Sequence, residues 1–371
     1  MGFGGAYRIN DRFKLGGEVS EGYGGLGGKV LGDFRFDDRR TMYINYLSDA
    51  DRTDTGYRGR AQSWVTGSRY RFSDHGSLFS EERITRGSGP AGLTHAYGLD
   101  LAPNDRWSYG GKLETGKLSD PLAGDFNRRA IAGTIGYQEG KSKYAGNLEY
   151  RVEHGPTDNR TTWLTRNTLG YQLDPAWRLL GRANYSISNS SQGTQFNADY
   201  TELVGAFAYR PVTNDRWNAL FKYTYFYNLP SPGQLAANGA TADYSQKSQI
   251  LSIDTIYDVR PWVSVGVKYA IRHGELLPSK TGSEWLSSNT DLIVLRTDFH
   301  WIREWDIVGE LRRLGVRAAR DSRSGALLGV YRHIDDNIKL GVGYNFTNFS
   351  SDLTDQSYRS HGFFINMLSK F

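Results

Sequence analysis

The chain has 371 residues, with 44 glycines, 10 prolines, no cysteine and a formal net charge of +5. The absence of cysteine excludes disulfides, thiolate catalysis and cysteine-ligated metal sites. Hydrophobic residues make up only 38% of the chain while aromatic residues reach 13%, and a soluble protein normally carries more apolar residues to fill its core. Lysine and arginine are scattered along the chain, which argues against a nucleic-acid-binding patch.

Alternating apolar and polar residues recur along the whole chain, which is the period-two signature of β-strands. We count about 21 such segments, roughly one every 18 residues, which leaves room for the ~9–11 residues of a membrane-spanning strand. The pattern is clear where Tyr223 and Tyr225 flank Thr224. The clearest segments in chain order are residues 13–19, 30–36, 107–114, 144–152, 217–228, 263–272 and 338–346.

Two kinds of connection alternate between these segments. One kind is short and rich in Asn, Asp and Arg, residues that favour tight turns, and an aromatic often follows it, as at Phe13, Trp107, Trp177, Trp217, Trp262 and Trp305. The other kind is longer and polar, and is expected at residues 119–127, 154–160, 188–197, 231–244, 274–289 and 350–360. Short turns at one rim, longer loops at the other and a girdle of aromatic residues are typical of bacterial membrane barrels.

We therefore predict an all-β fold, a single transmembrane antiparallel β-barrel domain over residues 1–371, with short periplasmic turns and longer extracellular loops. We expect about 20–22 strands, with 22 as the best value, in the outer membrane of a Gram-negative cell. A soluble β-solenoid or propeller would show a fixed repeat, and these segments have none. A membrane helix would need about 20 apolar residues, whereas unbroken apolar runs here are short, such as Leu292–Leu295.

The directions of the end strands raise a question of parity. The first strand, at about residues 2–9, runs into a short turn, and the last strand runs toward the same rim. This gives an odd count, whereas bacterial single-chain barrels normally have an even number of strands. One strand missing before Met1, or one miscounted element, would restore the even number. The first residues also lack a secretory signal pattern, so we expect a signal that was removed or that lies upstream.

Three stretches, residues 90–107, 219–234 and 324–355, carry a resemblance to a known family. They resemble the C-terminal outer-membrane β-barrel domain of large proteobacterial surface proteins, which are often labelled OmpA-like or TonB-dependent-receptor-like. The resemblance covers nearly the whole chain, from about residue 5 to Phe371. It implies a barrel that follows long extracytoplasmic regions, often with immunoglobulin-like repeats, and it implies little about activity.

The polar faces of the predicted strands supply candidate pore-lining residues. We expect nineteen basic against nine acidic side chains in the lumen, a surplus that would favour anions weakly because charged wall residues set pore preference. The basic set includes Arg332 and Lys370 as well. The charged residues that we expect to line the pore are Lys112, Glu114, Arg151, Arg166, Arg182, Lys222, Lys268, Arg272, Arg296, Asp298, Glu310, Arg312 and Lys339.

The last strand suggests a second kind of site. Phe363, Ile365, Met367 and Phe371 alternate along it, and the final residue is aromatic. This pattern resembles the signal by which outer-membrane barrels are recognised for assembly. We therefore expect the barrel-assembly machinery among the partners of the chain.

The sequence shows no zinc-protease, phosphate-loop, nucleophile-elbow or EF-hand motif. We expect no enzymatic activity, no cofactor and no metal, although a Ser/His/Asp site assembled across strands stays open. A TonB-dependent transporter would need an N-terminal plug of well over a hundred residues, and here strand patterns begin at once.

Our main functional hypothesis is a membrane anchor and wide aqueous pore for a larger surface protein. Two alternatives stay open. One is a general diffusion porin with weak anion preference, and the other is a secretion or assembly conduit that encloses a partner polypeptide. Expected partners are outer-membrane lipid and either the protein's own N-terminal extracytoplasmic region or a polypeptide in the lumen, and no nucleic acid.

Overall fold

The computed structural model describes residues 2–22, 25–49, 61–87, 90–120, 124–194, 197–213, 216–229, 245–278, 284–302, 304–317, 320–334, 338–347 and 362–369. These residues form 22 strands in one sheet. The first eleven are β1 (Gly2–Arg8), β2 (Phe13–Gly22), β3 (Gly25–Arg35), β4 (Arg40–Asp49), β5 (Ala61–Ser73), β6 (Gly76–Gly87), β7 (Ala91–Leu101), β8 (Trp107–Asp120), β9 (Gly124–Glu139), β10 (Ser142–His154) and β11 (Asn159–Gln172). The others are β12 (Trp177–Ser190), β13 (Ala198–Tyr209), β14 (Trp217–Leu229), β15 (Ser245–Arg260), β16 (Val263–Leu277), β17 (Leu286–Ser287), β18 (Thr290–Ile302), β19 (Trp305–Val316), β20 (Asp321–His333), β21 (Ile338–Asn345) and β22 (Gly362–Ser369).

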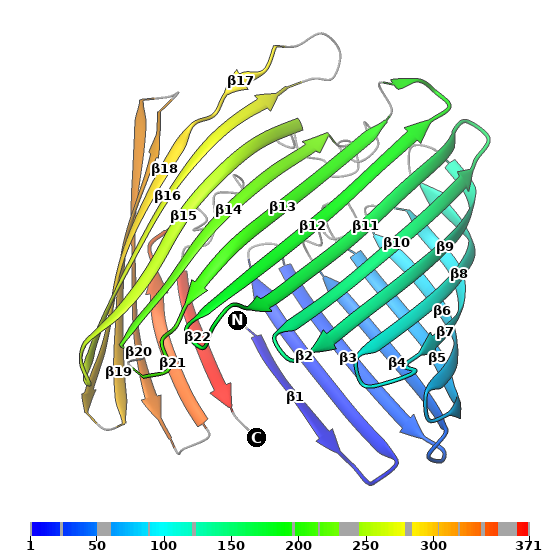
Figure 1. Ribbon diagram of the computed structural model, residues 1–371, viewed down its shortest axis with the longest axis horizontal. Helices are drawn as coiled ribbons and strands as arrows, with labels where there is room; N and C mark the ends of the chain where they lie inside the picture. Colours follow the sequence, from blue (N-terminus) through cyan, green and yellow to red (C-terminus); the bar gives the residue numbers. More distant parts are fainter. Residues whose placement is uncertain are drawn as a thin grey trace.

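The sheet winds into a barrel of tilted strands (Figure 1). Neighbours in the sheet are neighbours in the sequence, and the ladders that join them are antiparallel, as from β1 to β2 and from β21 to β22. β17 is only two residues long and pairs with the upper end of β16, while β18 pairs with the rest of β16. The prediction of an all-β antiparallel barrel of 20–22 strands is confirmed. In the part of the chain that the structure describes, no helix is long and apolar enough to span a membrane.

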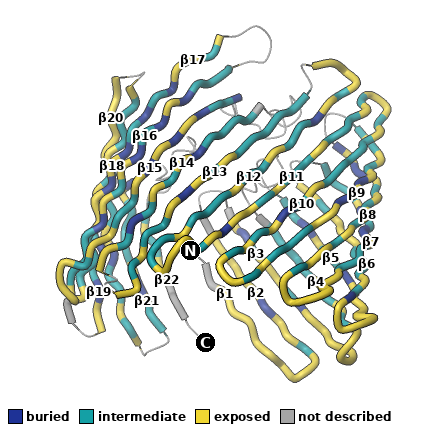
Figure 2. Tube along the Cα trace, viewed as in Figure 1, coloured by how far each residue is buried: buried dark blue, intermediate teal, exposed yellow. Residues whose placement is uncertain are grey.

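The two faces of the sheet differ in chemistry. On β14, Phe221 and Tyr223 lie on one face and are 39% and 44% exposed, while Lys222 and Thr224 lie on the other because side chains alternate along a strand. The register carries the apolar face across the sheet: Tyr223 lies beside Leu251, and Val267 beside Leu295. Exposure alternates along many strands in the same way (Figure 2). We call the apolar face the outer face, since in a transmembrane barrel it meets lipid.

The charged face is the concave, inner one. A cavity of about 380 Å³ is lined by residues of β15, β16, β18, β19, β20, β21 and β22, from Ile256 to Asn366. These lining residues occupy the charged face, as the cross-strand partners Arg296 with Glu310 and Ser264 with Asp298 show for its centre. A single cavity reached from seven strands requires a face that curves inward. The charged side chains therefore point toward the lumen.

The recurring Asn-Asp-Arg turns have a local cause. Asn104 Oδ1 accepts hydrogen bonds from the backbone N–H groups of Arg106 and Trp107 at 3.0 and 2.9 Å, an Asx-turn in which the side chain replaces a backbone acceptor. Asp174 repeats this before Trp177 at 2.9 Å. The aromatic that follows each turn then packs on its neighbours: Trp107 lies 4.6 Å from Tyr137, ring centre to ring centre. The short-turn rim thus carries the aromatic girdle that the sequence predicts.

The connections at the other rim are shorter than the sequence suggests. A loop was expected at residues 154–160, but β10 extends to His154 and β11 begins at Asn159. β9 and β15 are each 16 residues long, more than the ~9–11 that a span requires. The hairpin ladders continue past the membrane because polar residues can pair across strands in water. The loops expected at 231–244 and 350–360 lie outside the described residues.

The odd parity expected from the sequence is also found. Without the two-residue β17, the strands of the described ranges number 21, and β1 and β22 both run toward the short-turn rim (Figure 1). No ladder in the described ranges joins these two strands, although they lie side by side. The sheet is therefore wound into a barrel with one seam.

Candidate functional site: the charged inner wall

The thirteen charged residues selected from the sequence share one face of the sheet. Cross-strand registers link Glu114 to Arg151 through Ala130, and Arg296 to Glu310 directly. The inner-face positions are Lys112, Glu114, Arg151, Arg166, Arg182, Lys222, Lys268, Arg272, Arg296, Asp298, Glu310, Arg312 and Lys339. That these residues line an aqueous passage stays a prediction.

A lattice of ion pairs covers the inner face of β8, β9 and β10. Lys112 Nζ lies 3.1 Å from Glu114 Oε2, and Arg151 Nη2 lies 2.6 Å from Glu149 Oε1. Arg128 closes the group, since its Nη2 lies 2.6 Å from an oxygen of Glu153. All of these side chains are at most 30% exposed. The sequence analysis missed Arg128, which occupies an even-numbered position of β9 among the apolar inner residues Phe126 and Ala130.

A second group gathers on β18, β19, β20 and β21. Asp306, whose side chain is 6% exposed, accepts hydrogen bonds from His300 at 2.6 Å, from His333 at 2.8 Å and from Lys339. Arg296 pairs with Asp298 at 2.9 Å, and Arg312 pairs with Glu310. Of these residues, Arg296, Asp298, His300, Asp306 and Lys339 line the 380 Å³ cavity. The described residues contain no group of His, Asp and Glu arranged to hold a metal ion.

The remaining predicted residues are spread over the wall. Arg182 Nη1 lies 3.6 Å from Glu202 Oε1, and Lys268 lies opposite Asp254 in the register. Arg272 is 1% exposed and donates hydrogen bonds to Gln246 Oε1 at 3.2 Å and Ser288 Oγ at 3.4 Å. The structure therefore does not bring all thirteen residues into one site.

The inner wall has an open side and a buried side. On β14, β15, β16 and β18 the inner-face residues Thr224, Ile250, Ala270 and Leu292 are between 0% and 3% exposed. On β3, β5 and β6 the inner-face residues Lys29, Arg35, Arg71 and Arg83 are exposed. Water in the lumen therefore has access to the wall of the N-terminal strands, where these four exposed bases outnumber the exposed acid Asp33 of β3.

One assignment from the sequence is wrong. Arg332 is expected in the lumen, but it is the cross-strand partner of Trp305 and its guanidinium lies 5.5 Å from the centre of that ring on the outer face. On the inner face of β14, Thr224 is only 3% exposed. Lys370 lies outside the described residues.

The basic surplus of the inner wall is also smaller than nineteen to nine. The register between strands adds further charged inner-face positions of both signs to those predicted from the sequence. The additional acids are Glu81, Asp120, Glu202, Asp258, Asp306 and Asp321, and the additional bases are Arg83, Arg128, Lys143, Arg160 and Arg323.

Phe363 and Ile365 of the proposed assembly signal lie on the outer face of β22, as register partners of Tyr344 and Val342. Met367 pairs with Leu340 in the same ladder, and Phe371 lies outside the described residues. Recognition of this strand during assembly stays a prediction.

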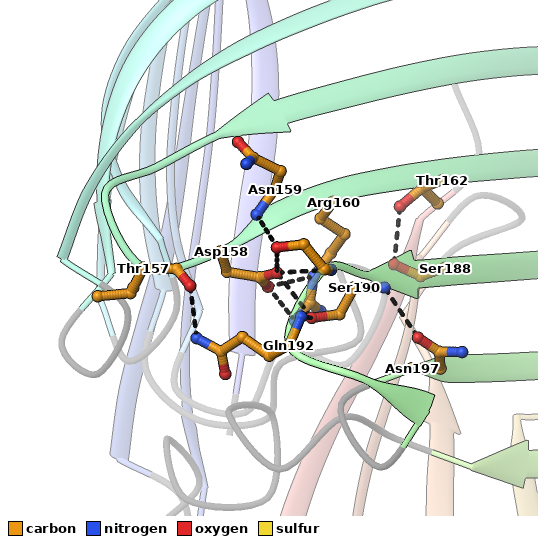
Figure 3. Close-up of polar contacts among 10 residues, drawn as sticks. Thr157, Asp158, Asn159, Arg160, Thr162, Ser188, Ser190, Gln192 and Asn197 are labelled. Carbon is orange, nitrogen blue, oxygen red and sulfur yellow. Dashed lines mark hydrogen bonds and ion pairs between the residues drawn. The ribbon is translucent and has the colours of Figure 1, made fainter.

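A polar cluster fixes the long-loop rim where β10, β11 and β12 meet (Figure 3). Asp158 accepts hydrogen bonds from Ser190 Oγ at 2.6 Å and from Arg160 Nη2 at 3.0 Å. Gln192 Nε2 donates to the Thr157 carbonyl at 2.8 Å. Burial opposes ionisation of Asp158, but the hydrogen bonds from Ser190 and Arg160 outweigh it and hold the pKa of the carboxyl below its ordinary value. Two connections far apart in the sequence are thus joined.

Comparison with known proteins places the fold. No protein-family model matches the chain, and no curated protein matches its sequence. Among solved structures, the siderophore receptor PirA from Acinetobacter baumannii is 10% identical with a TM-score of 0.57, over 100% of this chain and 77% of that one. The ferric enterobactin receptor PfeA from Pseudomonas aeruginosa is 11% identical with a TM-score of 0.57, over 100% and 77%.

The alcaligin outer-membrane receptor FauA from Bordetella pertussis is more distant. It is 11% identical with a TM-score of 0.50, over 91% of this chain and 69% of that one. Identities this low show the fold alone. The chain thus has the fold of a transmembrane β-barrel, the fold that it shares with these receptors.

Proposed function

We propose that the barrel encloses an aqueous passage with a weak preference for anions and serves as the membrane anchor of a larger surface protein. One observation supports the aqueous passage and its preference for anions. On the inner wall of β3, β5 and β6, four basic side chains are exposed to the lumen: Lys29, Arg35, Arg71 and Arg83. The anchor rests on the resemblance of the sequence to C-terminal barrels of surface proteins.

The arrangement of charges on the inner wall supports only a weak preference for anions. Arg69 of the open wall pairs with Asp100 at 2.8 Å, and the lattice around Glu114 is largely neutralised by its own pairs. Ions that lie farther from the wall than the Debye length of ~8 Å at physiological salt are largely screened from its charges. The surplus of basic over acidic side chains therefore acts mainly on ions that pass close to β3, β5 and β6.

A second candidate is an uptake receptor for a bulkier ligand. Two of the similar structures are, by name, a siderophore receptor and a ferric enterobactin receptor. The hydrogen-bonded cluster around Asp158 gives the long-loop rim a fixed polar surface. A receptor of this kind would hold its ligand at the rim and conduct few ions without it. Conductance of the purified barrel separates the two candidates.

The test is conductance in planar bilayers. We expect stepwise conductance from the purified protein, and we expect the triple variant Lys29→Gln, Arg71→Gln, Arg83→Gln to lower the ratio of anion to cation permeability. Lys117→Gln with Arg129→Gln is the matched control, because these exposed bases lie on the outer face of β8 and β9. An equal change in both variants, or the absence of conductance, would contradict the proposed passage.

A further inference from the structure

The outer face of β5, β6, β7 and β8 carries polar side chains in the middle of an apolar band. Glu82 and His95 are register partners on β6 and β7, and they lie on the same face as the exposed side chains of Tyr97 and Leu113. Hydroxyl side chains on the neighbouring strands flank them on this face. We call these six residues the outer polar patch: Thr66, Ser68, Ser80, Glu82, His95 and Thr115.

The outer polar patch lies at the depth of the hydrocarbon core. Glu82 is six residues from Gly76, where β6 starts at the short-turn rim, and His95 is six residues from Leu101, where β7 ends there. Six residues cover about 20 Å of strand, or about 15 Å of height at a tilt of ~40°, within an apolar band about 25 Å tall. Six residues from the start of β14, the outer-face residue is the aromatic Tyr223. The outer face of β6 and β7 is instead ionisable at this depth.

The contact between Glu82 and His95 satisfies neither side chain fully. His95 Nδ1 lies 3.4 Å from Glu82 Oε1, farther than the ~2.7–3.2 Å of an ordinary hydrogen bond. The Glu82 side chain is 65% exposed and that of His95 is 36% exposed. Lipid chains offer neither hydrogen bonds nor solvation, so ionisable side chains at this depth are costly unless a protein surface covers them. The patch therefore requires a polar partner within the membrane.

A groove beside the patch gives such a partner room to approach. It has a volume of about 610 Å³, and Ser68, Ser80 and Tyr97 contribute to its lining. The groove opens on the outer face, since Ser68 and Tyr70 of β5 line it while Arg69, which points inward between them, does not. Because serine side chains are short, a facing protein surface can approach the sheet closely here.

We propose that the outer polar patch is the interface with a second copy of this chain, in which Glu82 of each copy meets His95 of the other. The patch is self-complementary, because it holds one acid and one base on neighbouring strands. A two-fold axis along the membrane normal, passing between β6 and β7, sets each of the two residues opposite the other kind. Both copies then have the same orientation in the membrane. The proposal rests on the transmembrane barrel fold and not on the proposed aqueous passage.

Cysteine cross-linking in lipid vesicles tests whether two copies meet at this wall, since the chain has no cysteine of its own. Ser80→Cys changes the outer-face residue of β6 next to Glu82, and Gly205→Cys on the outer face of β13 is the matched control. Ser80 is four residues from Gly76, and Gly205 is four residues from Tyr209 at the short-turn end of its strand. We expect a short bismaleimide to join two copies through position 80 and not through position 205. Equal cross-linking at both positions, or none at position 80, would overturn the proposal.

An exchange of charges tests the pairing between the two copies. In a dimer of one variant, Glu82→Lys sets two bases against each other at both contacts, and His95→Glu sets two acids against each other. We therefore expect each variant alone to lose energy transfer between donor-labelled and acceptor-labelled copies in vesicles. When the two variants are mixed, positions 82 and 95 of opposite copies again hold an acid and a base at both contacts, so energy transfer should return. Within each barrel the like pair remains, so the recovery reports only contacts between copies.

Milder variants separate the loss of pairing from a loss of folding. Glu82→Gln and His95→Gln should each reduce energy transfer between wild-type-sized barrels that keep the gel mobility of the folded state. Energy transfer that persists in the Glu82→Lys variant, or that stays absent when the two folded variants are mixed, overturns the proposal. Cross-linking of the Ser80→Cys variant to a different protein in the native membrane overturns it as well, because another partner then covers the patch.

Discussion

Arg128 and Glu153 are register partners on β9 and β10, and an ion pair of 2.6 Å joins Arg128 Nη2 to Glu153 Oε1 on the inner wall. Their side chains are 17% and 15% exposed, so neither is well solvated if the other is removed. The pair also illustrates the lumen as a whole, in which much of the charge is already matched across strands.

Replacing either partner should destabilise the barrel. We expect Arg128→Gln and Glu153→Gln each to lower the free energy of unfolding by about 1–2 kcal/mol, because a charged, mostly buried group loses its hydrogen-bonding partner. The double variant should lose less than the sum of the two. Urea unfolding in lipid vesicles measures these energies, and strictly additive losses would show that the two side chains do not interact.

The two faces of β3 offer a direct test of which side meets lipid. Val30 lies on the outer face and is 45% exposed, and its neighbour Leu31 lies on the open inner wall. Val30→Arg should cost about 2–4 kcal/mol near the bilayer midplane, and Leu31→Arg much less. Equal losses of unfolding free energy for these adjacent positions would reverse or remove the face assignment.

Gly98 is required by its neighbours rather than by its own backbone. A Cβ at Gly98 would overlap the ring of Phe79 and lie 2.8 Å from the Gly111 carbonyl oxygen. We expect Gly98→Ala to cost about 1–3 kcal/mol, the usual range for overpacking. Gly111→Ala on the adjacent strand is the control, since a Cβ there meets nothing within 4 Å. Unfolding experiments that rank the two variants the other way would contradict this packing.

The rim cluster around Asp158 should respond to pH in one direction. The pKa of Asp158 lies below its ordinary value in the folded barrel, so its contribution is present above the ordinary pKa and is lost as the pH falls through the lowered one. We expect the amides of Asn159 and Ser191 to lose protection in that acidic window, where protection is the exchange rate relative to the intrinsic rate at the same pH. In the Asp158→Asn variant these two amides should be less protected at neutral pH, and their protection should not change with pH. If their protection still falls with pH in this variant, another group titrates.

The strand periodicity was sufficient to predict the barrel, its two faces and its odd parity, because alternation along a strand is a local property. Arg332 is an exception to the expectation that charged residues point inward. A basic side chain at the rim of the apolar band can lie over Trp305 and remain in contact with water. The pairing of Arg128 with Glu153 depends on the register between strands, which a single sequence does not reveal. The burial of Leu292 depends on tertiary structure in the same way.

The most direct measurement of the central claim is the reversal potential of the purified barrel in a planar bilayer under a salt gradient. The open basic wall at Lys29, Arg35, Arg71 and Arg83 predicts a small anion-selective potential at low salt that fades toward molar salt, as screening shortens the Debye length to about 3 Å. A cation-selective potential at low salt would contradict the charge assignment of the inner wall. The complete absence of conductance would contradict the passage itself.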